Sequence, residues 1–105
     1  IVFDANWYHY LFSEELRNAY EEDRKNVKRA HLYDHNIGEN FDQMERIAEQ
    51  LPMTLIDRPS WDKVELEKIG FQDIQIDTEV YQRVWTQEEK INYASTPLFE
   101  IVATK

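Results

Sequence analysis

The fold class is decided by the stretch IVFDANWYH at residues 1–9. Its opening is apolar without alternation, which is typical of a strand buried on both faces of an α/β sheet. A polar and aromatic segment, residues 6–9, follows directly. Ligands of open α/β sheets bind outside the carboxyl ends of the strands. The stretch therefore predicts an α/β protein with a strand at about 1–5 and a candidate site immediately after it.

A helical insertion is expected at about 14–51. Ser13 is a candidate N-cap for a first helix over about 14–31, and acidic residues fill its first turn, where the helix dipole favours anions. A second helix is predicted to begin with a capping box in which Asn40 is the cap and Gln43 reaches back. Its apolar residues recur at spacings of three and four, which indicates one apolar face. These residues are Phe41, Met44, Ile47 and Leu51.

A third helix is predicted at about 61–69. Ser60 is its candidate cap, Trp61 and Val64 are expected to be its buried side chains, and Gly70 ends it, as glycine does at a helix C′ position.

Two further strands complete the predicted sheet. Residues 71–80 alternate between apolar and polar side chains, which is typical of an edge strand with one solvated face. Residues 98–103 are almost continuously apolar and predict an interior strand. The connection at 81–97 is expected to be a long hairpin loop.

Composition limits the possible partners. The 105 residues carry 21 acidic against 12 basic side chains, a formal net charge of −9. Without a basic block, nucleic acid and anionic membrane surfaces are excluded as predicted partners. No apolar run approaches the roughly 18 residues of a membrane span, and the absence of cysteine excludes disulfides and thiolate metal ligands. A soluble cytoplasmic protein is expected.

Two segments resemble one enzyme family. IVFDANWY at 1–8 resembles the segment after a Leu-Lys-Pro-Gly-Gly turn in class I S-adenosylmethionine-dependent methyltransferases of bacteria, in the branch related to quinone biosynthesis. RPSWD at 58–62, followed by Leu66 and by Gly70-Phe71, resembles the last helix of the same enzymes. The resemblance covers the whole chain and is loosest at 10–56.

The resemblance implies that residues 1–105 are the C-terminal portion of a methyltransferase domain with a seven-stranded Rossmann-like sheet. The three predicted strands would be the fifth, sixth and seventh, with the last lying between the other two. Residues 10–56 would form a lid-like helical insertion. S-adenosylmethionine would be bound by residues outside this chain, so the fragment alone is expected neither to bind the cofactor nor to be active. Its exposed sheet edge is expected to self-associate.

Five residues are predicted to contact a small-molecule substrate of the parent enzyme: Asn6, Trp7, Tyr8, His9 and Trp85. Amide and phenol groups would hydrogen-bond the substrate, and the indoles would wall a pocket, since pockets are largely lined by aromatic side chains. The alternative is that these aromatic side chains only cover the end of the sheet. No catalytic residue is identified, and the methyl acceptor is not named.

Two other function classes remain open. The chain would be a free-standing acidic α/β protein-interaction module if its exposed helix docked a basic partner. A metal-dependent enzyme built on His9, His31 and His35 is the third possibility, because His31 and His35 have helical i,i+4 spacing. No glutamate follows them in the zinc-protease pattern, and histidines at a helix C-terminus are favoured by the dipole. No metal ligand is therefore predicted.

Overall fold

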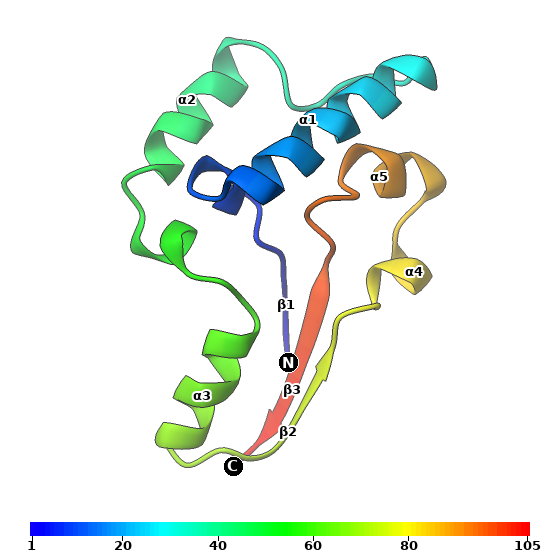
Figure 1. Ribbon diagram of the computed structural model, residues 1–105. Coiled ribbons are helices and arrows are strands. Elements are labelled where there is room, and N and C mark those ends of the chain that lie inside the picture. Colours follow the sequence, from blue (N-terminus) through cyan, green and yellow to red (C-terminus); the bar gives the residue numbers. More distant parts are fainter.

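The computed structural model describes all residues 1–105 as a three-stranded antiparallel sheet with five α-helices and two 3-10 turns. The protein is thus α/β, as the sequence predicts. Figure 1 shows the strands side by side in the lower half of an elongated molecule, with most of the helices above and beside them. In chain order the elements are β1 (Val2–Asp4), η1 (His9–Leu11), α1 (Glu14–Arg29), α2 (Glu39–Ala48), η2 (Pro52–Leu55), α3 (Ser60–Lys68), β2 (Gln72–Asp77), α4 (Tyr81–Val84), α5 (Gln87–Asn92) and β3 (Phe99–Thr104).

The last strand of the chain is the central strand of the sheet. The strand order is β1-β3-β2, and β3 is antiparallel to both neighbours (Figure 1). Ile101 of β3 pairs with Val2 on one side and with Ile76 on the other. Both Phe99 and Ile101 are buried, so the prediction of an interior strand at about 98–103 is confirmed.

β1 is shorter than predicted and is not buried. Ile1 is 83% exposed and Phe3 is 53% exposed, so the expectation of a strand covered on both faces is wrong within this chain. The reason is that β1 lies at the edge of the sheet, where β3 is the one element that packs extensively against it. The uncovered edge presents unpaired backbone groups and apolar side chains.

β2 ends three residues before the predicted end at Val80. The side chain of Asp77 accepts a hydrogen bond from the backbone N–H of Glu79 at 2.8 Å, and such a bond turns the chain out of a strand. A bulge interrupts the pairing with β3 near its start, where Asp73 has a φ of 45°. The alternating pattern therefore overestimated the length of the strand.

Residues 81–97 are not a simple loop. They contain α4 and α5, and α5 begins with a capping box in which the Thr86 side chain accepts from the N–H of Glu89 while the Glu89 side chain accepts from the N–H of Thr86. The sequence carried this signal as Thr-x-x-Glu, and we did not predict the helix from it.

The helix caps were predicted with mixed success. The Ser13 hydroxyl accepts a hydrogen bond from the N–H of Leu16 at 3.3 Å, which confirms it as the cap of α1. The prediction of a capping box at Asn40 is wrong, because α2 begins at Glu39. Gly38, which has a φ of 100°, occupies the N-cap position. Ser60 also lies inside its helix rather than before it, and Pro59 takes the cap position.

Gly70 ends α3 as predicted. Its φ is 100°, in the left-handed region that glycine adopts without strain. The N–H of Phe71 donates to the carbonyl of Leu66 at 3.0 Å, and the N–H of Gly70 donates to the carbonyl of Glu67 at 3.2 Å. These two bonds form the Schellman pattern.

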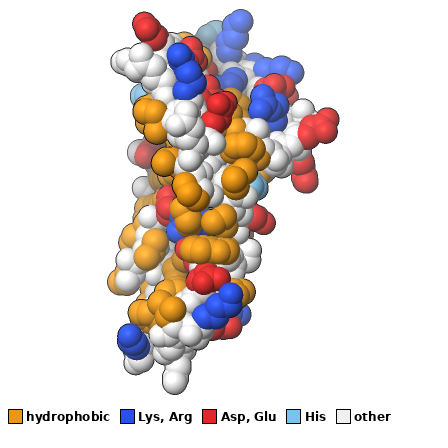
Figure 2. Space-filling model, turned by 90° about the vertical axis from the view of Figure 1, so that its left-hand side faces the viewer, with side chains coloured by type: hydrophobic (Ala, Val, Ile, Leu, Met, Phe, Trp, Pro, Cys, Tyr) orange, Lys and Arg blue, Asp and Glu red, His pale blue; other side chains and the backbone are white.

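Much of the apolar surface of this chain is uncovered. α3 buries Asp62 instead of Trp61 and Val64, both of which are exposed. The apolar face of α2 also has no partner, and Ile47 is 62% exposed. Figure 2 shows hydrophobic side chains gathered along the face where α2, η2 and α3 lie. None of the helices has the length and apolar character that crossing a bilayer requires.

Candidate functional site

A cavity of about 120 Å³ lies at the carboxyl end of β1. Four of the five predicted site residues line it, namely Asn6, Trp7, Tyr8 and His9. They are adjacent in sequence because the strand ends at Asp4 and the chain then turns into η1. The opposite wall consists of residues that the sequence did not assign to the site: Met53, Thr54 and Arg58.

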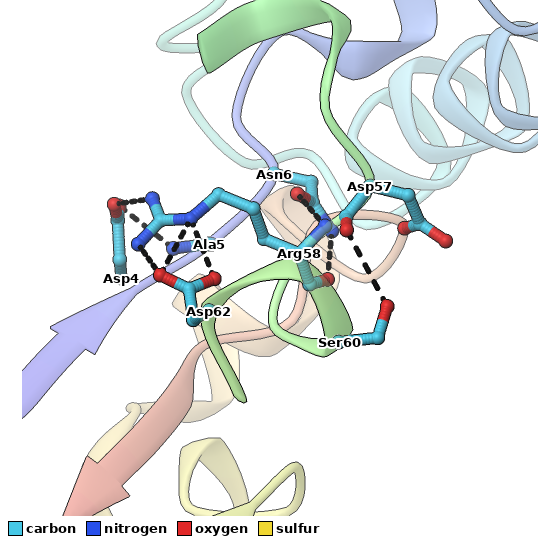
Figure 3. Close-up of polar contacts among 7 residues, drawn as sticks. All are labelled: Asp4, Ala5, Asn6, Asp57, Arg58, Ser60 and Asp62. Carbon is cyan, nitrogen blue, oxygen red and sulfur yellow. Dashed lines mark hydrogen bonds and ion pairs between the residues drawn. The ribbon is translucent and has the colours of Figure 1, made fainter. Parts of the chain in front are cut away.

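Asn6 is fully engaged with the backbone of Arg58. Its Nδ2 donates to the Arg58 carbonyl at 2.7 Å, and its Oδ1 accepts from the Arg58 N–H at 3.1 Å (Figure 3). The amide thereby makes the two bonds that a neighbouring strand would make. Both its nitrogen and its oxygen are engaged within the chain, so Asn6 positions the cavity wall.

The guanidinium of Arg58 joins two carboxylates. Its Nε and Nη2 bind Asp62 at 3.0 and 2.8 Å, and its Nη1 pairs with Asp4 (Figure 3). The side chain is only 13% exposed and lies over the ring of Phe99, 5.4 Å from its centroid. The hydrogen bonds to Asp62 are the main cause that raises the pKa of Arg58. This network fixes α3 against the end of β1 and supplies the charged wall of the cavity.

His9 attaches η1 to η2. Its Nδ1 lies 2.8 Å from the carbonyl oxygen of Thr54, which requires the tautomer that is protonated at Nδ1. His9 is therefore oriented by a backbone acceptor, and its Nε2 is the ring nitrogen left for another partner.

Trp85 does not line this cavity, but it lies against one of its walls. The ring centroids of Trp7 and Trp85 are 6.2 Å apart, and Tyr93 lies 5.7 Å from each of them. Tyr81 contacts Trp85 at the same distance. Tyr81 of α4, Trp85 between α4 and α5, and Tyr93 directly after α5 thus form one cluster behind Trp7, and this cluster fixes the indole in place.

A second cavity, of about 60 Å³, lies on the other side of Trp7 and Tyr8. Asp23, Asn92 and Ser95 are among its lining residues, and the sequence analysis missed all three. The Asp23 carboxylate accepts the N–H of Ser95 at 2.8 Å, and burial raises the pKa of that carboxyl. Because Asp23 lies within an acidic run of a helix, nothing in the sequence distinguished it from its solvated neighbours.

Tyrosine side chains hold α1 and α2 against η1. Tyr10 stacks on Tyr20 of α1 with ring centroids 3.9 Å apart, and its hydroxyl bonds the carboxylate of Glu45 on α2. Burial raises the pKa of Tyr10 well above that of a free phenol. Tyr8 packs on Phe41, the one member of the predicted apolar stripe that meets the site.

The three histidines are not gathered at one place. The structure contains no group of three or more His, Cys, Asp or Glu side chains arranged to hold a metal ion. The ring of His35 instead packs edge-on against Tyr33, with centroids 4.7 Å apart.

No family model, curated protein or solved structure matches the chain. The functional argument therefore depends on the geometry of the site. That geometry consists of two adjacent cavities that share the Trp7–Tyr8 wall, one bordered by a guanidinium and the other by a buried carboxylate. Such a site can bind and orient a small polar molecule.

Proposed function

We propose that this chain is the C-terminal part of an S-adenosylmethionine-dependent methyltransferase that acts on a small molecule. In this proposal it contributes the substrate side of the active site and the end of a seven-stranded sheet, in a cytoplasmic bacterial enzyme. The cofactor is bound by residues outside this chain, and the chain alone is inactive. Methyl transfer is then catalysed mainly by holding the acceptor in line with the methyl group.

The observation that carries the proposal is the strand order. A last strand inserted antiparallel between two earlier strands is the arrangement that the family resemblance implies for the fifth, seventh and sixth strands. The uncovered edge of β1 gives independent support, because in the parent sheet another strand would pair with it. Exposed apolar side chains at Ile1 and Phe3 are the kind of surface that such a neighbour would cover.

The cavity at the end of β1 fits the role of a substrate site. It is bordered by Trp7 and Tyr8, and its charged wall is the Arg58 network. Ligand sites in open α/β sheets lie in this position. Asn6, His9 and Trp85 have supporting roles in the proposal, because their observed contacts orient the walls.

The interaction-module hypothesis has one observation in its favour. The apolar face of α2 is exposed, at Met44 and Ile47 in particular, and exposed apolar patches mark interaction surfaces. In the methyltransferase proposal the same face belongs to the lid-like insertion.

The coding sequence upstream of Ile1 separates the two hypotheses. The methyltransferase proposal requires a Gly-rich turn after a strand, an acidic residue about 20 positions later, and a Pro-Gly-Gly turn shortly before Ile1. A start codon directly before Ile1 would contradict it and would leave the interaction module as the better hypothesis.

A further inference from the structure

The cavity behind Trp7 and Tyr8 combines aromatic rings with unpaired acceptors. It lies where α5 packs against α1 (Figure 1). Five of its ten lining residues are aromatic, and none of the ten is basic. The aromatic side chains are Trp7, Tyr8, Tyr20, Phe41 and Tyr93.

Three oxygen-bearing side chains of the cavity, Asp23, Asn92 and Ser95, keep hydrogen-bonding capacity that the chain does not use. Asp23 is 5% exposed and has no ion-pair partner. Asn92 is 3% exposed, and its Oδ1 accepts no hydrogen bond. The buried hydroxyl of Ser95 also has no partner. Because burying such groups unpaired is costly, their arrangement indicates a ligand that donates hydrogen bonds.

The guanidinium of Arg24 opposes the effect of burial on the pKa of Asp23 but forms no ion pair with it. Arg24 follows Asp23 directly, but its Nη1 pairs with Asp34 and its Nη2 donates to the Asn92 carbonyl. Arg24 lines a different, open cavity on the outer side of α1. The buried carboxylate therefore has no cation in ion-pair contact within the chain.

We propose that this cavity binds a protonated primary amine. An ammonium group has three N–H donors, which match Asp23, Asn92 and Ser95, and aromatic faces attract a cation. The inference rests on the proposed function in one respect only, namely that the ammonium group belongs to the methyl acceptor. A protonated amine has no lone pair, so this group anchors the acceptor and a different atom receives the methyl group.

The test uses the chain without any cofactor, so that its outcome is independent of methyl transfer. Methylammonium chloride is titrated into the isotopically labelled protein, and amide chemical shifts are followed by NMR. We expect saturable shifts at Asn36, Asn92, Ser95 and Thr96, all of which line the cavity. For a ligand of two heavy atoms the limit on affinity corresponds to a Kd on the order of 10 mM. Sodium chloride at equal concentration controls for ionic strength.

Three variants and one second probe make the result decisive. Asp23→Asn retains an acceptor for the Ser95 N–H and should abolish saturable binding, whereas Glu21→Gln, at an exposed position on the same helix, should leave it unchanged. Ser95→Ala should weaken binding without removing the backbone bond to Asp23. Tetramethylammonium, which has no N–H donor, should not bind.

Absence of saturable shifts with methylammonium would overturn the inference. Equal binding of tetramethylammonium, or unchanged binding by Asp23→Asn, would also overturn it. None of these results would bear on whether the parent protein transfers methyl groups.

Discussion

The side-chain amide of Asn6 hydrogen-bonds both backbone groups of Arg58, a residue 52 positions away in the chain. This pairing joins the end of β1 to the start of α3 and places the Arg58 side chain between Asp4 and Asp62. The charged wall of the candidate site is thus held by the amide of Asn6 and the guanidinium of Arg58.

Replacing Asn6 by alanine should destabilise the fold. Asn6→Ala leaves the N–H and carbonyl of Arg58 without their partners, and the expected loss in the free energy of unfolding is about 1–3 kcal/mol. Chemical denaturation measures it. Asn18→Ala, at an exposed position of α1, is the matched control and should be neutral. A loss of equal size in both variants would contradict the role assigned to Asn6.

Arg58→Lys should destabilise the protein although the charge is kept. An ammonium cannot reproduce the two-pronged contact with Asp62 while also reaching Asp4, so about 1–3 kcal/mol of stability should be lost. Arg83→Lys is the control, because its pair with Asp77 is exposed and exposed pairs contribute little. If the two variants unfold at the same denaturant concentration, the Arg58 network is not what fixes α3 against β1.

Asp23 should make stability depend on pH in a defined direction. Burial raises the pKa of Asp23 above its ordinary value of 3.8, so at pH values between the unfolded-state and folded-state pKa the folded state binds more protons than the unfolded state. The stability contributed by the protonated form is fully present below pH 3.8 and is lost as the pH rises through the folded-state pKa. Neighbouring charges, at Arg24 and Glu22, act in opposite directions on this carboxyl.

Asp23→Asn removes this titration. Relative to the unsubstituted chain, the variant should gain stability between acid and neutral pH, because it has no carboxyl to ionise in the buried position. Denaturation of both proteins at several pH values measures the difference. A relative loss of stability with rising pH would show that Asp23 is stabilised as a carboxylate.

The open edge of β1 should make the isolated chain self-associate. Val2→Lys places a charge on that edge, a device by which natural edge strands avoid pairing, and should shift the chain toward monomer in sedimentation equilibrium. Val84→Lys, at an exposed position of α4, adds the same charge elsewhere and should not. A monomeric unsubstituted chain would show that the edge is not a pairing surface.

The sequence predicted the interior strand, the Ser13 cap and the Gly70 stop because local chemistry decides each of them. A run of apolar residues predicts a strand, a hydroxyl before an acidic turn predicts a helix start, and a glycine predicts a helix end. Each of these patterns spans only a few neighbouring positions. The sequence also brought residues 6–9 to one cavity, because a strand end gathers its own neighbours.

The errors arose where distant residues decide the structure. The helical periodicity of α2 correctly indicated an apolar face, but periodicity cannot show whether anything covers that face. Buried polar groups were missed for a related reason. Asp23 and Asp62 resemble ordinary surface acids until Ser95 and Arg58 are brought against them. The spacing of four between Arg58 and Asp62 was the one local sign of that pair.

The central claim is that this chain completes a methyltransferase whose cofactor site lies elsewhere in the protein. The most direct test is to measure S-adenosylmethionine binding by calorimetry, for residues 1–105 and for the full translation product of the reading frame that contains them. We predict binding by the full product and none by residues 1–105 alone. Failure of the full product to bind the cofactor, or binding by residues 1–105 alone, would contradict the account.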